Sequence, residues 1–157
     1  MLDSWLQHHR QTLLMKCTGL GAEQLRERSV PPSGLSLLGL VRHMAEVERS
    51  WFRRNFGEDT DMPWVFCSEE SPDGDFDDVD TADPETDFAT FEAECAAADD
   101  VTRGHSLDET FVHPRRGTEM SLRWVYVHMI EEYARHNGHA DLLRESVDGL
   151  VGHDPPE

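Results

Sequence analysis

The stretch SLRWVYVHMIEEYARHNGHADLLRE, residues 121–145, decides the fold of this chain. Its apolar side chains recur at helical spacing, which predicts an amphipathic helix from Leu122 to about Val147, with Ser121 as the N-cap and Gly149 as the terminator. Three polar side chains interrupt the apolar stripe: Glu132, His136 and His139. Because a lone buried carboxylate is costly unless it is paired or bound to a metal, these side chains require a partner.

Three further segments show the same helical spacing. The first expected helix covers residues 2–18, the second runs from Leu37 to about Phe56 after an N-cap at Ser36, and the third opens at Pro84 and lasts to about Gly104. No run of alternating apolar and polar residues predicts a strand, and residues 107–120 are expected to form a loop. The chain of 157 residues is therefore expected to be one all-α domain over residues 1–157, a four-helix bundle with long connections.

A second polar residue interrupts an apolar face in the helix expected from Leu37, where His43 stands beside Leu40 and Met44. Glu132 and His136 are four residues apart, so both can reach one ion, and His43 from a facing helix would supply a third ligand. Two imidazoles and one carboxylate with an open position suit Zn²⁺, and also Ni²⁺ or Fe²⁺, so the ligand types do not choose among these metals. We expect one divalent ion, with zinc as the first candidate.

The role of His139 stays open at this point. It lies one turn beyond His136, so it could be a fourth ligand, a proton donor in catalysis, or a residue that supports His136. The alternative to a metal site is that the inward polar residues satisfy one another.

Composition excludes several classes of function. The chain has 14 Lys and Arg residues against 32 Asp and Glu residues, and its formal net charge of -18 at pH 7 would repel the backbone of a nucleic acid. No segment approaches the ~18 consecutive apolar residues of a membrane helix, and the N-terminal stretch MLDSWLQHHRQ does not resemble a signal peptide. The three cysteines contain no CxxC pair and indicate reduced thiols. We expect a cytoplasmic protein without nucleic-acid or membrane partners.

The negative charge is concentrated in the middle of the chain. Between Asn55 and Thr102 there are 17 acidic residues and no Lys or Arg. Residues 57–83 combine this charge with turn residues and are predicted to form a long loop, docked through the central residues 64–66 and with a mobile acidic second half. The loop could be a lid that filters cationic ligands or a solvated connection, and Cys67 within it could approach the metal. Trp51 and Trp124 are expected in the core, and His113 on the surface.

The chain resembles the DinB-like superfamily, and within it an actinobacterial branch. The resemblance covers nearly the whole chain and is strongest in VPPSGLSLLGLVRHMAEVERSWF at 30–52 and in residues 121–145. It implies a four-helix bundle that binds one divalent metal through His43, Glu132 and His136. Many members carry HRGQ after the last ligand, whereas this chain has His136, Asn137, Gly138 and His139.

Characterised members of the superfamily include thiol-dependent enzymes, such as the mycothiol-dependent maleylpyruvate isomerase, whose N-terminal domain is the related part. The resemblance therefore implies a metal-dependent S-transferase that joins a low-molecular-weight thiol such as mycothiol to a small electrophile. One alternative is a non-catalytic binding or stress protein in which the metal holds two helices together. The other is a metal-dependent hydrolase with His139 as proton shuttle. Members are often homodimers, but no stretch of this sequence marks an interface.

Overall fold

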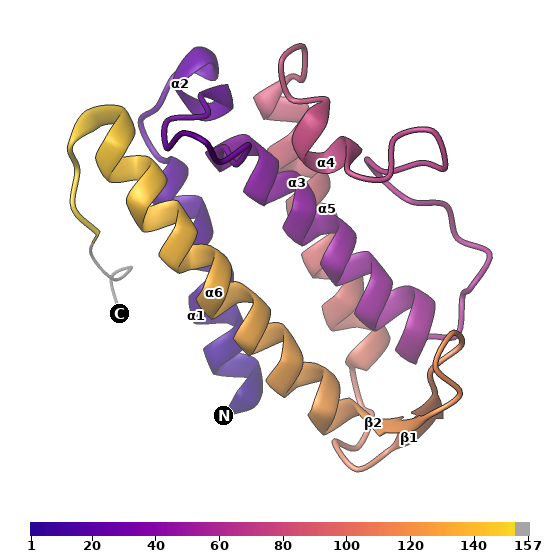
Figure 1. Ribbon diagram of the computed structural model, residues 1–157. Coiled ribbons are helices and arrows are strands. Elements are labelled where there is room, and N and C mark those ends of the chain that lie inside the picture. The colour runs from indigo at the N-terminus through magenta and orange to yellow at the C-terminus, as the bar shows by residue number, and fades with distance from the viewer. Residues whose placement is uncertain (153–157) are drawn as a thin grey trace.

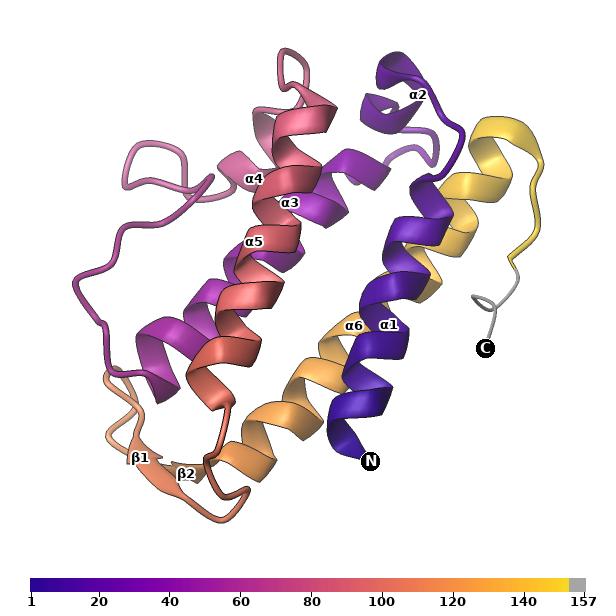
Figure 2. The ribbon, with the colours of Figure 1, turned by 180° about the vertical axis from the view of Figure 1, so that it is seen from behind.

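Two pairs of long helices form the body of the protein in the computed structural model, which describes residues 1–152. Helix α1 lies side by side with α6, and α3 lies side by side with α5 (Figures 1 and 2). The elements, in chain order, are α1 (Leu2–Cys17), α2 (Ala22–Arg26), α3 (Leu37–Glu48), η1 (Arg49–Phe56), α4 (Gly74–Asp77), α5 (Pro84–Thr102), β1 (Thr110–Val112), β2 (Glu119–Ser121) and α6 (Leu122–Asp148). The predicted all-α bundle is therefore confirmed.

The ends of the predicted helices agree with the structure because local capping chemistry sets them. The side chain of Ser36 accepts a hydrogen bond from the backbone N–H of Gly39, and that of Ser121 accepts one from Trp124. Pro84 opens α5 at its first turn, where its missing N–H costs nothing. Gly149 ends α6 with a φ of 79°, a left-handed conformation that favours glycine.

Two predictions about the connections were wrong. Residues 110–121 form a hairpin in which Phe111 pairs with Met120, whereas a loop was expected; each strand has only three residues, too few to show an alternating pattern. The second expected helix reaches Phe56 as predicted, and its geometry changes from α to π at Arg49. The acidic segment 57–83 contains the short helix α4, and its second half is packed rather than mobile, since Asp75 and Val79 are buried.

Side chains of α3 hold the acidic segment against the bundle. Oε1 of Glu46 accepts hydrogen bonds from the backbone N–H groups of Val65 and Cys67, at 2.7 and 2.9 Å. Arg42 donates to the backbone carbonyls of Gly74 and Asp75, both at 3.0 Å. The strongly acidic segment is therefore fixed mainly by its backbone, which leaves many of its carboxylates at the surface.

The core between the helices contains a buried ionic network. Arg10 of α1 forms a two-pronged contact with Glu48 of α3, at 2.7 and 2.6 Å, and the hydroxyl of Tyr133 in α6 donates to the same carboxylate at 2.7 Å. All three side chains are buried. Arg10 also donates to Asp99 of α5, so the network joins the four long helices.

Within residues 1–152, no helix combines the length and the apolar character needed to cross a bilayer. The single domain expected over residues 1–157 stays a prediction, and its last five residues lie outside the described part of the chain.

Candidate metal centre

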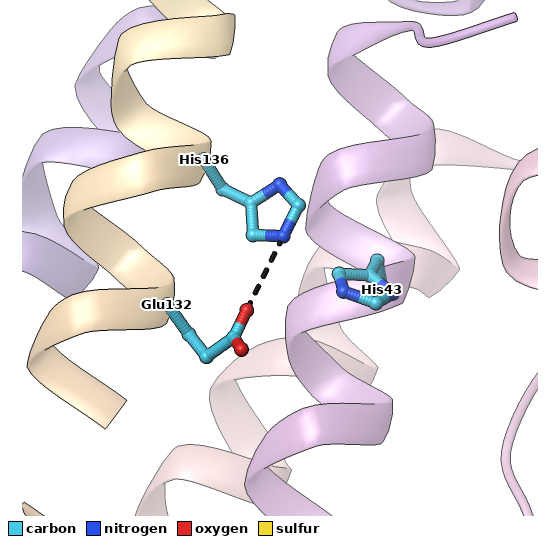
Figure 3. A group of neighbouring side chains, drawn as sticks. All are labelled: His43, Glu132 and His136. Carbon is cyan, nitrogen blue, oxygen red and sulfur yellow. Dashed lines mark ion pairs between the residues drawn. The ribbon is translucent and has the colours of Figure 1, made fainter. Parts of the chain in front are cut away.

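Helices α3 and α6 bring three predicted ligands together. One ligand atom from each of His43, Glu132 and His136 lies within 4.8 Å of the other two. Figure 3 shows Glu132 and His136 extending from α6 toward α3, which carries His43. Their side chains remain 25%, 18% and 12% exposed, respectively, so the group sits at the edge of the core with access from solvent. This is shallower than the core position that the helical stripe predicted.

His43 is oriented by a carboxylate on its far side. Its Nδ1 lies 2.7 Å from Oδ2 of Asp75, and Phe76 stacks on the imidazole with the ring centroids 4.9 Å apart. Because a carboxylate accepts hydrogen bonds, this contact favours the His43 tautomer that carries its proton on Nδ1. Nε2 of His43 is then left with a lone pair, which is the arrangement that carboxylate partners produce in histidine metal ligands.

Asp75 itself is held by the packing of α4 on α3. Arg42 binds its backbone carbonyl, and the side chain is almost fully enclosed. The close approach depends on Gly39, because a Cβ at that position would lie 2.9 Å from the Phe76 ring. Asp75 is the site residue that sequence reasoning missed. It is one of 11 acidic residues in the segment 57–83, and nothing in the spacing distinguishes it from its neighbours.

His136 is also in a state suited to metal binding. Burial, followed by the nearby charges of His43 and His139, lowers the pKa of His136 to about 4, so its imidazole is neutral at pH 7. Its Nε2 lies 3.6 Å from Oε2 of Glu132, and its Nδ1 lies 3.4 Å from Nδ1 of His139. His139 therefore contacts His136 on the side opposite Glu132, and it is not among the three residues whose ligand atoms converge.

The donor set matches a catalytic zinc site in number and type. Two imidazoles and one carboxylate leave a fourth position open in tetrahedral coordination. Glu132 has a second neighbour in His128, whose Nε2 lies 3.7 Å from Oε1 of the carboxylate. His128, Glu131 and Glu132 form a further group with converging ligand atoms, but Glu131 is exposed and pairs with Arg135.

The cysteines of the chain are poor nucleophiles. Burial raises the pKa of Cys67 to about 11 and that of Cys17 to about 12, and it raises the pKa of Cys95 further. Cys67 lines a cavity of about 260 Å³ together with His43 and Asp75, yet it is not part of the converging group. A thiol that reacts at this site would therefore come from outside the chain.

Two aromatic predictions need correction. Trp124 is 39% exposed rather than in the core, because it lies in the first turn of α6 and stacks on His128. His113, expected on the surface, is buried against Trp51, with the ring centroids 5.5 Å apart. The hairpin folds back onto η1 and produces this contact, which the sequence did not predict.

Comparison with known proteins gives one match. A family model described as Mycothiol-S-transferase matches residues 1–149. The matched span contains all the helices and strands of the described structure, and it includes His43, Asp75, Glu132, His136 and His139. No curated protein and no solved structure matches the chain.

Proposed function

Because the chain belongs to the mycothiol S-transferase family, a DinB-like family, we propose that it transfers the thiol of mycothiol to a small electrophile with the help of one divalent metal, zinc by preference. The observation that carries the metal dependence is the convergence of His43, Glu132 and His136 within 4.8 Å. The contact of each imidazole Nδ1 with another side chain supports the proposal, because it leaves each Nε2 for the metal.

The proposed reaction is a substitution at carbon. The sulfur of the thiolate forms a bond to the electrophilic carbon, the leaving group departs with its bonding pair, and the thiol proton goes to solvent. A bound Zn²⁺ would lower the pKa of the thiol and so supply thiolate at neutral pH. Glu132 would contribute a negative charge to the site, and the two imidazoles would contribute neutral donors.

We propose that His139 acts as a positioning residue for His136. If Nε2 of His136 faces the metal, its Nδ1 carries the proton and donates to Nδ1 of His139. Replacing His139 with Ala should weaken metal binding about 10-fold, and replacing it with Gln should restore part of the loss, as measured by competition with a chromogenic chelator. The direct catalytic role predicted for His139 gains support instead if kcat falls while metal occupancy stays complete.

The cellular setting is also a proposal. Three free cysteines, with no disulfide among them, are consistent with the reducing cytoplasm. A homodimer is suggested by the DinB-like resemblance, and sedimentation would test it.

The test of the proposed function is thioether formation from mycothiol and 1-chloro-2,4-dinitrobenzene, followed by absorbance. We expect the zinc-loaded protein to be active, and the His43→Gln variant to lose on the order of 100-fold or more in kcat/KM. His105→Gln is the matched control, because His105 is exposed and pairs with Glu109 away from α3. Equal activity in His43→Gln and the wild type would contradict the metal assignment. Hydrolysis of a nitrophenyl ester without any need for thiol would favour the hydrolase alternative.

A further inference from the structure

A second cavity adjoins the proposed centre along the same face of α3 and η1. Its volume is about 500 Å³, within the range typical of small-molecule sites. Ser50, Trp51 and Trp64 line both this cavity and the smaller one that contains His43. A ligand lying along this face could therefore contact both regions at once.

The second cavity is lined by three arginines, Arg54, Arg115 and Arg116, and we call this cavity the arginine pocket. These three arginines differ from most other arginines of the chain in that they form no ion pair with a carboxylate of the described residues. Nine of the thirteen arginines in the chain contact a carboxylate. Within residues 1–152, the three pocket arginines contact none, although the chain carries 32 acidic residues. Among the other arginines of the described chain, Arg26 alone also lacks a carboxylate contact, and it binds the backbone carbonyl of Ala82.

The hairpin fixes the backbone of two of these arginines. Nδ1 of His113 accepts hydrogen bonds from the backbone N–H groups of Arg115 and Arg116, at 3.2 and 3.4 Å. The loop closes through Gly117, whose N–H donates to the carbonyl of His113 and whose φ is 63°. The buried histidine thus holds the loop in place, while the guanidinium groups stay at the exposed surface.

Aromatic rings form the walls between the cations. The guanidinium of Arg54 lies 4.2 Å from the ring centroid of Trp64, and that of Arg115 lies 5.8 Å from the same ring. Arg54 also donates to the carbonyl of Met62, which fixes the side chain but leaves further N–H donors. The pocket therefore combines flat apolar surfaces with guanidinium groups that suit a carboxylate.

We propose that the arginine pocket binds a carboxylate on the electrophilic substrate, with the planar body of that substrate against Trp51 and Trp64. This assignment rests on the proposed function, because it places the electrophilic carbon toward His43. The substrate class is then a planar electrophile that carries a carboxylate. The long-range field of an acidic protein opposes the approach of such an anion, so local arginines are required to bind it.

Direct binding tests the pocket without any catalysis. The probe is 3,5-dinitrobenzoate, which lacks a leaving group, titrated into the wild type by calorimetry. The double variant Arg115→Gln with Arg116→Gln should raise Kd about tenfold or more. The control is Arg103→Gln with Arg123→Gln, which changes the net charge equally at exposed positions outside the pocket. Equal Kd in the two double variants would overturn the proposal, as would tighter binding of inorganic phosphate than of the aromatic acid.

A matched pair of substrates tests the link to the reaction. In 4-chloro-3,5-dinitrobenzoate and its methyl ester, the sulfur of mycothiol displaces chloride, which leaves with the bonding pair. We expect the wild type to prefer the acid over the ester about tenfold or more in kcat/KM, relative to the uncatalysed rates, and we expect the pocket variant to lose this preference. Transfer without any preference would contradict the proposal and leave the proposed function intact. Arginine-dependent binding without transfer to either compound would contradict the proposed function and leave the carboxylate site intact.

Discussion

Asp75 holds the imidazole of His43 through a 2.7 Å contact, and this contact sets which nitrogen faces Glu132 and His136. The carboxylate is buried, and its helix is fixed by Arg42, so the orientation of His43 is determined before any metal arrives. Partners of this kind raise the basicity of a histidine ligand and reduce the freedom of its ring. At the scale of single residues, the proposed centre depends on Asp75 as well as on the three ligands.

Replacing Asp75 with Asn should weaken zinc binding about 10- to 100-fold, because the amide is a neutral partner for His43 Nδ1. The measurement is competition with a chromogenic chelator at constant pH. Asp77→Asn is the matched control, since Asp77 lies in the same helix, is exposed, and loses the same charge. Equal affinities in the two variants would show that Asp75 does not support His43.

The sequence predicted part of the candidate site for a clear physical reason. Glu132 and His136 are four residues apart on one helix, and helical geometry places such residues on one face. His43 could be added because it interrupted an apolar face. Asp75 could not, because its position depends on how the acidic segment returns to α3, and no local pattern encodes that contact.

At the scale of secondary structure, the network of Arg10, Glu48 and Tyr133 connects α1, α3 and α6. Arg10 and Glu48 have almost no exposed surface, and the carboxylate accepts three hydrogen bonds. Removing one partner from such a group leaves the other buried without compensation. The relative positions of α3 and α6, and therefore of the proposed ligands, depend on this network.

Replacing Glu48 with Gln should lower the free energy of unfolding by about 3–5 kcal/mol, because Arg10 would lose its main charge partner. Urea denaturation followed by circular dichroism would measure the change. Glu23→Gln, an exposed position in α2, should change stability by less than ~0.5 kcal/mol. A loss below ~1 kcal/mol for Glu48→Gln would show that the network of Arg10, Glu48 and Tyr133 contributes little to stability.

The helices and strands differ in how far their own sequence determines their structure. The long helices were predictable because apolar spacing and capping residues such as Ser36, Ser121 and Gly149 lie within the elements themselves. The hairpin and α4 were not, since each is too short to show a period and is stabilised by contacts with η1 or α3. The sequence did not predict the ionic network of Glu48 either, because its buried partners lie on other helices.

Across the whole molecule, ion pairs between helices compensate part of the excess negative charge locally. Glu94 of α5 accepts from Arg49 at 2.5 Å and from Arg53 at 2.9 Å, so it ties η1 to α5. Burial tends to raise the pKa of Glu94, but the hydrogen bonds and charges of the two arginines outweigh burial and lower it. Ionised Glu94 therefore contributes to stability above the ordinary glutamate pKa.

This contribution should disappear in acid. Since the folded pKa is lowered, the stabilisation is complete above about pH 4.5 and is lost as the pH falls through the folded pKa. The difference in unfolding free energy between the wild type and Glu94→Gln should thus be present at pH 7 and shrink below about pH 4. Urea titrations across this range would measure it. If the difference in unfolding free energy stays constant down to acid pH, ionised Glu94 does not contribute to stability in this way.

The proposed function depends first on the binding of one metal ion by His43, Glu132 and His136. The most direct measurement is elemental analysis of protein purified without an affinity tag, compared with the Glu132→Gln variant prepared in the same way. We predict about one zinc ion per chain in the wild type and a large loss in the variant, because the amide removes the only charged ligand. The absence of stoichiometric metal from the wild type, even after loading with zinc, nickel or iron, would contradict the metal site.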